Sequence, residues 1–457
     1  MKTSIRKEIR EFFKLAIPLA SAQIAQSLTG FCDTLMMGRF GGETLAAGGL
    51  ASLTFLATLN ITAGITMGVS PLISEAVSTG DTEKVTKLAR QGFWLVCLLT
   101  IPLAIAIANF ELIMLRLGQT KTTVTIANSY LNIVLWGYFP ALGFAMLRGV
   151  VSGLSQTRPV MVIVALGTLF NVAGNYVLGF GKLGFPRLEL QGLAIASTIS
   201  WWVMFFALLI YILKHPQLKT YKIIARLHKL ELAIFIQLLK IGVPIGVFLA
   251  LEIGLFTIVT YLMGALGTEV LAAHQIVFQT VMVVFMIPLG MSYAATVRVG
   301  HWLGQKNYSQ IEQSGYLQIG IGLIFAVVIT IAMLLFPRAI VSLYIDINDP
   351  VNQEIVKLAI PMLTIATVCQ IPDVIQKMTY GVLQGIQDTK IPMLLSIPAF
   401  WGIGLSLGYI FGFPLGWGGM GLWLGQSLGV AIAAILFLVR FRDRLFQLKL
   451  RFCAVKK

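Results

Sequence analysis

Twelve long apolar stretches dominate this chain of 457 residues. A predominantly apolar stretch of roughly 20 residues crosses the hydrocarbon core of a bilayer as a helix, because a helix satisfies its backbone hydrogen bonds internally. The composition agrees, since 12% of the residues are charged whereas soluble domains carry about a quarter. We therefore predict an all-α membrane protein with twelve transmembrane helices, at about 12–37, 45–73, 91–115, 126–152, 158–180, 190–213, 232–264, 270–298, 312–336, 352–382, 392–412 and 419–440.

The basic residues lie unevenly around these stretches. The net charge is +15, and most Lys and Arg side chains fall at the N-terminus, in the even-numbered loops and in the C-terminal tail. Positively charged loops stay on the cytoplasmic side, so we expect both termini in the cytoplasm of a bacterial inner membrane. None of these basic runs forms a patch that suggests base stacking, so we expect membrane lipids rather than nucleic acid beside them.

The two halves of the chain share sequence patterns in the same order. The segment Lys14–Ala20 (KLAIPLA) matches Lys240–Gly246 (KIGVPIG), and Phe40–Ala47 (FGGETLAA) matches Leu266–Ala273 (LGTEVLAA) at the same offset. Two further pairs of segments match at slightly larger offsets. Six spans per half is an even number, so both halves enter the membrane from the same side. We therefore expect two lobes related by a pseudo-two-fold axis along the membrane normal.

The repeat sets the expected domain boundaries. We predict an N-lobe at 1–213, a basic cytoplasmic linker at 214–231, a C-lobe at 232–445 and a basic cytoplasmic tail at 446–457. In transporters of this layout the substrate pathway lies at the interface of the repeats. Gene duplication without any transport role is the alternative.

Three carboxylates lie inside predicted spans, namely Asp33, Glu252 and Asp373. A carboxylate near the bilayer centre costs at least about 2.5 kcal/mol, so it is a candidate for function. Glu252 has apolar sequence neighbours, so it suits exchange of a proton, Na⁺ or a cationic substrate. The alternative for Glu252 is a protonated side chain in a hydrogen bond between helices. Asp33 could instead pair with Arg39 or have a role at the end of its helix.

Other polar residues and prolines accompany these carboxylates. Asn171 and Asn175 share one helical face and either complete a polar site or make ordinary interhelical hydrogen bonds. Lys377 lies four residues after Asp373, so it could neutralise that carboxylate as an ion pair. We expect Pro18, Pro244 and Pro372 to kink their helices. We also expect Pro372 to free a backbone carbonyl and to interrupt its helix, as in the broken helices that build ion sites.

Sequence signals for an enzyme or a metal site are weak. The four cysteines form no CxxC pair, and His274 and His301 favour structural roles over metal binding. The chain carries neither HExxH nor a P-loop motif. Gly404-Leu-Ser406-Leu-Gly408 matches GxSxG, but it lies in an apolar helix rather than at a strand-to-helix turn. We therefore expect no enzyme and no cofactor. A channel is disfavoured because the acidic residues differ between the halves.

Several motifs jointly resemble the multidrug and toxic compound extrusion (MATE) family, in particular its NorM-like branch. They are the segment Asp33–Ala47 (DTLMMGRFGGETLAA), Ala272–Ile276 (AAHQI) and Arg298–Gly304 (RVGHWLG), together with Glu252 in the seventh span and Asp373 in the tenth. The resemblance covers nearly the whole chain. Lys377 departs from the family pattern.

The resemblance implies a secondary antiporter that exports lipophilic organic cations against inward Na⁺ or H⁺. Its coupling carboxylates would be Asp33, Glu252 and Asp373, supported by Asn171 and Asn175. A Na⁺ ion would sit at Glu252 and Asp373, and the NorM-like features favour Na⁺ over H⁺. The alternative is a related flippase for lipid-linked sugars or other amphiphiles, with a more cationic cavity. We expect a monomer, because one chain supplies both lobes.

Overall fold

The computed structural model describes residues 5–116, 120–221, 223 and 230–454. All regular secondary structure within these residues is helical, and twelve of the helical segments are long and apolar enough to cross a membrane. The predicted all-α class and the twelve predicted spans are confirmed. The chain is a multi-pass membrane protein.

The helices divide between two compact units that do not coincide with the two halves of the sequence. Unit 1 contains Met1–Ala20 and Val247–Lys457, and unit 2 contains Ser21–Gly246. Helix α1 (Ile5–Gly38) therefore begins in unit 1 and ends in unit 2, and helix α11 (Leu232–Leu266) begins in unit 2 and ends in unit 1. The units therefore differ from the predicted lobes at two places. The beginning of α1 packs into the core of unit 1, and the beginning of α11 packs into the core of unit 2.

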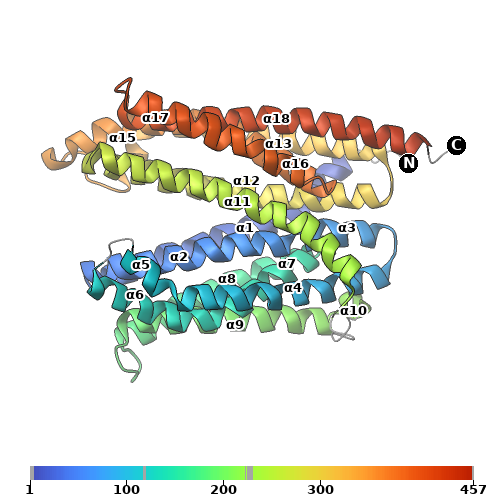
Figure 1. Cartoon of the computed structure of the whole chain (residues 1–457), viewed down its shortest axis with the longest axis horizontal. Coiled ribbons are helices and arrows are strands. Elements are labelled where there is room, and N and C mark those ends of the chain that lie inside the picture. Colours follow the sequence, from blue (N-terminus) through green and yellow to red (C-terminus); the bar gives the residue numbers. More distant parts are fainter. Residues whose placement is uncertain (1–4, 117–119, 222, 224–229, 455–457) are drawn as a thin grey trace. The chain divides into compact units, whose positions relative to one another are not determined.

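Unit 2 is a bundle of helices around a shared apolar core, seen in blue to green in Figure 1. It comprises the end of α1, the beginning of α11, and α2 (Gly42–Met67), α3 (Val69–Ser78), α4 (Thr82–Ala108), α5 (Phe110–Arg116), α6 (Lys121–Val134), η1 (Leu135–Gly137), α7 (Tyr138–Gly153), α8 (Arg158–Gly174), η2 (Asn175–Gly179), α9 (Glu189–Lys214) and α10 (Pro216–Lys219). Helix α7 is almost wholly buried at the centre, where Tyr138 donates or accepts a 2.7 Å hydrogen bond with Thr62. The α8 helix continues into η2, a π-helical segment.

Unit 1 is built in the same way around a second core. It comprises the beginning of α1, the end of α11, and α12 (Thr268–Gly304), α13 (Tyr308–Leu335), α14 (Pro337–Ser342), η3 (Pro350–Asn352), α15 (Gln353–Gly385), α16 (Lys390–Ser396), η4 (Ile397–Leu405), α17 (Ser406–Gly412) and α18 (Gly418–Ala454). Helix α15 packs against α12, α13 and α18. Glycines permit the closest approach, since a Cβ atom on Gly425 of α18 would lie 2.0 Å from the backbone nitrogen of Gly408.

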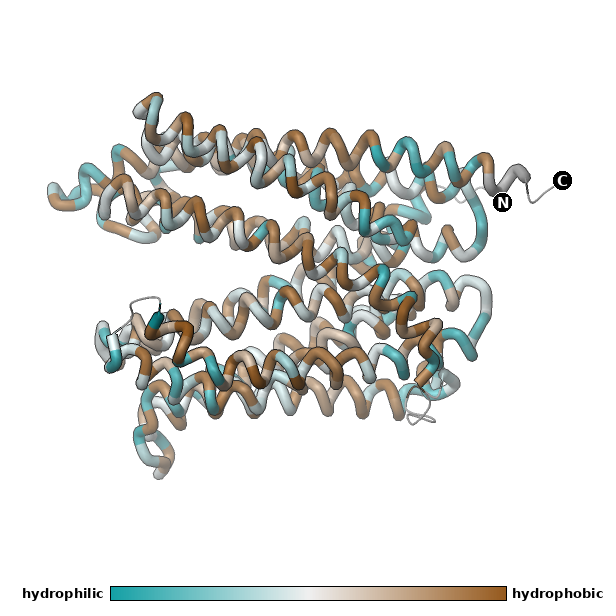
Figure 2. The backbone as a smooth tube through the Cα atoms, viewed as in Figure 1, coloured by the Kyte–Doolittle hydropathy of each residue, from teal (hydrophilic) through white to brown (hydrophobic). Residues whose placement is uncertain are grey.

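The surface of both units is apolar along the middle of the helices. Figure 2 shows hydrophobic residues along the helices and hydrophilic ones gathered towards many of their ends. Leucines and isoleucines stand fully outward, among them Leu53 at 70% exposure, Ile101 at 63% and Ile324 at 66%. Exposed side chains of this kind suit lipid rather than water. This pattern is typical of a membrane-embedded bundle.

Three of the prolines in this fold were predicted to kink their helices. Pro18 lies within α1, Pro244 within α11 and Pro372 within α15, and each helix continues past its proline. Each proline removes one intrahelical hydrogen bond. Pro18 and Pro244 lie three residues before the points where α1 and α11 pass from one unit to the other. The size of the expected kinks stays a prediction.

Candidate functional site

A line of polar side chains runs through the middle of unit 2. Asn175 donates a hydrogen bond to the carboxylate of Asp33 at 2.5 Å and another to the side-chain oxygen of Asn171 at 3.1 Å. Asn171 in turn donates to the hydroxyl of Ser197 at 3.0 Å. All four side chains are buried, with Asn175 fully so. The structure therefore brings together the three polar residues predicted for the first half and adds Ser197.

Local helix geometry explains this convergence. Asn171 and Asn175 are one helical turn apart on the span formed by α8 and η2, so both lie on one face of it. Gln26, Thr29 and Asp33 follow the 3.6-residue period along one face of α1. Thr29 meets Thr168 of α8 at 2.9 Å between hydroxyl oxygens. One face of α1 thus supplies a polar stripe to the interior of unit 2.

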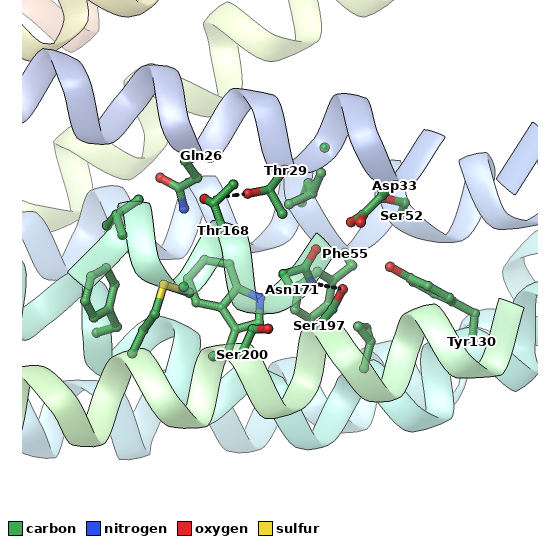
Figure 3. Close-up of a pocket in the computed structure, with 18 residues that line it drawn as sticks. Gln26, Thr29, Asp33, Ser52, Phe55, Tyr130, Thr168, Asn171, Ser197 and Ser200 are labelled. Atoms are coloured by element: carbon green, nitrogen blue, oxygen red, sulfur yellow. Dashed lines mark hydrogen bonds between the residues drawn. The ribbon is translucent and has the colours of Figure 1, made fainter. Parts of the chain in front are cut away.

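This stripe borders a cavity of about 90 Å³ inside unit 2 (Figure 3). In Figure 3, Asp33, Ser52 and Tyr130 lie together at one end, while Gln26 and Thr168 lie towards the other. The described residues that line the cavity include neither Lys nor Arg: Gln26, Thr29, Gly30, Asp33, Ser52, Phe55, Leu56, Tyr130, Val134, Phe144, Val164, Gly167, Thr168, Asn171, Ser197, Ser200, Trp201 and Met204. Its acidic charge is that of Asp33, so the cavity suits a cation.

The alternative pairing of Asp33 with Arg39 is not formed. Within the described part of the chain Asp33 has no basic side chain within salt-bridge distance, and Arg39 is exposed. Nothing among the described residues donates a hydrogen bond to the Oδ1 atom of Asn175, although that atom is fully buried. A buried acceptor without a donor is costly. A cation or a proton donor beside this oxygen would therefore be favoured.

The second-half carboxylates lie in unit 1. The ammonium of Lys377, on α15, is 2.7 Å from each carboxylate oxygen of Glu252, on α11. It also lies 5.1 Å from the ring centroid of Phe248 and 5.0 Å from that of Phe285. Lys377 therefore pairs directly with Glu252, and the alternative ion pair with Asp373 is not formed among the described residues. The apolar sequence neighbours of Glu252 do not reveal this partner, because the lysine lies on another helix.

Asp373 completes this cluster without a close salt bridge of its own. It lies within electrostatic range of both Glu252 and Lys377 and is half-buried, one helical turn before Lys377. Helix α15 runs unbroken from Gln353 to Gly385. The helix interruption expected at Pro372 is therefore absent, although the proline still leaves a carbonyl without its usual donor.

Sequence reasoning missed a buried acid at the start of α1. The carboxylate of Glu8 accepts hydrogen bonds from both the Nε and the Nη2 atoms of Arg298, the former at 3.1 Å. Ser314 and Trp302 donate to the same carboxylate at 2.7 and 3.4 Å. The Glu8 side chain is 2% exposed. The sequence did contain a signal: Glu8 lies shortly before the predicted first span, so it belongs to the same helix.

A similar ion pair holds the start of α11. Glu231, directly before this helix, pairs with the buried Arg90 of α4 and lies 3.5 Å from the ammonium of Lys87. Both helices that belong in part to each unit thus carry an acidic residue at or near their start that is paired with an arginine, the half-buried Arg298 for α1 and the buried Arg90 for α11. These two ion pairs fix the first turns of α1 and α11.

The histidines and the GxSxG serine have structural surroundings. His274 is buried and shares a 3.0 Å hydrogen bond with Thr260. No group of three or more His, Cys, Asp or Glu side chains suited to a metal occurs among the described residues. Ser406 begins helix α17 directly after the π-helical segment η4. It therefore lacks the strand-to-helix turn that a nucleophile elbow requires.

Comparison with known proteins gives a consistent picture. A profile of the MatE family matches residues 18–177 and 244–410. A "Probable multidrug resistance protein NorM" from Synechocystis sp. is 49% identical over 98% of this chain and 97% of its own length. A protein of the same name from Rhizobium meliloti is 36% identical over 93% of this chain and 91% of its own length.

Solved structures share the fold. A crystal structure of MATE in complex with MaL6 superposes with a TM-score of 0.87 at 22% identity, covering 97% of both chains. The eukaryotic MATE transporter AtDTX14 superposes with a TM-score of 0.86 at 18% identity, covering 98% of this chain and 99% of its own. At these identities the likeness concerns the fold alone.

Proposed function

The chain belongs to the MatE family, and on that premise we propose that it exports lipophilic organic cations in antiport with Na⁺ or H⁺. The export proceeds by alternating access of the two repeats. Relatives that cover nearly the whole chain bear the name multidrug resistance protein, which supports the substrate class. We place the protein in a bacterial inner membrane as a monomer with both termini in the cytoplasm.

The observation that carries this proposal is the carboxylate of Asp33 at the cavity of unit 2. Aromatic and aliphatic side chains form much of the cavity wall, while one acid supplies its negative charge. Such a lining favours a cation with apolar surface over an anion. When Na⁺ or H⁺ neutralises Asp33, the organic cation loses its counter-charge and leaves. Competition for one carboxylate thus couples the two fluxes without ATP.

The geometry also bears on the coupling ion. A proton needs one carboxylate, whereas Na⁺ needs several oxygen ligands. Asp33, Asn171, Asn175 and Ser197 supply such oxygens within one hydrogen-bonded chain, and one amide oxygen in it has no donor. This arrangement supports Na⁺ at the first-half site. At Glu252 the ammonium of Lys377 already binds both oxygens, which weighs against Na⁺ there.

The test is ethidium efflux from proteoliposomes under a Na⁺ gradient or a pH gradient, imposed one at a time. We expect efflux under one of them and at least a tenfold loss of coupled efflux in Asp33→Asn. The matched control is Glu83→Gln, which removes an acid from the surface of unit 2, with a side chain 78% exposed. Unchanged efflux in Asp33→Asn would refute the role of this carboxylate.

Absence of efflux under both gradients, from correctly folded protein, would refute drug export. A flippase for lipid-linked sugars would then be the better hypothesis. The cavity disfavours it at present, because none of the described lining residues is basic and the headgroups of such lipids carry phosphate. Transfer of a fluorescent lipid-linked sugar between leaflets of the same proteoliposomes measures that activity directly.

A further inference from the structure

The cluster of Glu252, Asp373 and Lys377 already contains a positive charge, which is the ammonium of Lys377. The Lys377 ammonium bridges both oxygens of Glu252 at 2.7 Å, and its side chain is 3% exposed. Two aromatic rings, those of Phe248 and Phe285, lie about 5 Å from the same nitrogen. Carboxylate plus aromatic rings is the usual environment of a bound ammonium ligand. Here the chain fills that place with its own side chain.

We infer that Lys377 restricts this cluster to substrates with a single positive charge. The inference rests on the proposed export of organic cations and specifies their charge. Glu252 and Asp373 carry two negative charges when ionised, and Lys377 compensates one of them through a direct, bidentate contact. With both acids ionised one negative charge remains, so a monovalent cation neutralises the cluster and a divalent cation leaves an excess positive charge.

The accessible surface of the cluster supports this view. The ammonium is covered, whereas Glu252 keeps 13% of its side chain exposed and Asp373 is half-buried. A ligand would therefore meet the carboxylates while the ammonium stays behind them. In a partly desolvated site an uncompensated charge is poorly screened, so valence discriminates strongly between ligands of similar shape.

A purely structural role for Lys377 makes a different prediction. If the lysine only stabilises the helix pair α11 and α15, its removal lowers the yield of folded protein but leaves the preference among substrates unchanged. If the lysine sets the charge, its removal changes the preference. The ratio of two transport rates, measured on the folded fraction, separates these roles.

The experiment compares the wild type with three variants that alter the charged residues of the cluster. With Asp373 ionised, the wild type carries a net charge of −1 and Lys377→Gln carries −2. Glu252→Gln carries 0, and the double variant Glu252→Gln with Lys377→Gln returns to −1. The probes are ethidium and propidium, which share a phenanthridinium ring but carry one and two positive charges. Efflux of each is measured from proteoliposomes with folded, size-exclusion-purified protein.

The expected results follow from these charges. Wild type exports ethidium and little propidium, and Lys377→Gln raises the propidium-to-ethidium ratio at least tenfold. Glu252→Gln loses export of both probes. The double variant regains ethidium export at the wild-type ratio. The control is Lys357→Gln, which removes a lysine from an exposed pair with Glu354 on the same helix and should keep the wild-type ratio.

The outcomes distinguish the hypotheses. An unchanged ratio in Lys377→Gln overturns the inference while leaving cation export intact. Propidium export by the double variant at the rate of Lys377→Gln also overturns the inference. The increase in propidium export would then come from the room left by the smaller side chain rather than from the change in charge. Lack of ethidium export by the wild type refutes the proposed function instead. If Lys377→Gln does not fold, the comparison of Glu252→Gln with the double variant still tests the charge rule.

Discussion

Replacing Glu8 by alanine should destabilise the protein more than any surface substitution in the same helix. The change leaves the guanidinium of Arg298, whose side chain is 12% exposed, without its carboxylate partner. It also removes the acceptor for Ser314 and Trp302. Removing one partner of a buried ion pair costs about 3–5 kcal/mol. For a unit of this size that corresponds to a fall in melting temperature of roughly 6–20 °C.

The assay is thermal unfolding in detergent, followed with a thiol-reactive fluorophore. Cys32, Cys97 and Cys369 are partly buried free thiols, so they report unfolding in both units. The control is Glu11→Ala, because Glu11 pairs with Lys14 at the surface of the same helix. An exposed pair contributes about 1 kcal/mol or less, so its loss should lower the melting temperature by at most about 4 °C.

A double variant tests the physical reason. Replacing Arg298 by methionine in the Glu8→Ala background removes the unpaired charge and should restore part of the lost melting temperature. The reasoning is refuted if Glu8→Ala melts within about 2 °C of Glu11→Ala. It is also refuted if Arg298→Met lowers the melting temperature of Glu8→Ala further, since the guanidinium would then be stabilising without its partner.

Further predictions concern the second arginine pair and the helix contacts of unit 1. Glu231→Ala, which leaves the buried Arg90 unpaired, should lower stability by about 2–4 kcal/mol; an effect below about 0.5 kcal/mol in the same thermal assay would contradict this. Gly425→Ala should cost about 1–3 kcal/mol or more because its Cβ would collide with the backbone of Gly408. Gly320→Ala meets nothing within 4 Å and should stabilise its helix by up to about 1 kcal/mol. Equal melting temperatures for the two glycine variants would refute the packing argument.

The fold was largely predictable because the membrane imposes a simple rule on sequence. Spans need long apolar runs, so their number and approximate positions follow from composition along the chain. The grouping of Asn171 with Asn175 was predictable as well, because residues four apart share a helical face. The meeting of both with Asp33 is a structural result, since it depends on how α8 packs against α1.

The partners of charged residues were predictable only within one helix. Helical spacing placed Lys377 beside Asp373, yet the lysine reaches Glu252 on α11 instead. A long flexible side chain can turn towards either carboxylate, and the choice depends on packing between helices that sequence spacing does not contain. Glu8 was missed for the related reason that its partner Arg298 lies about 290 residues away.

The passage of α1 from one unit to the other has a consequence for biogenesis. Phe12, Leu15, Ala16 and Leu19 belong to the apolar core of unit 1, whose other members begin at Phe248. The ribosome therefore completes the first helix long before it makes the residues that this helix packs against. At about 5–20 residues per second the delay is roughly 10–50 s. Insertion of α1 into lipid must precede its tertiary packing, so during synthesis the bilayer or a membrane chaperone holds these side chains.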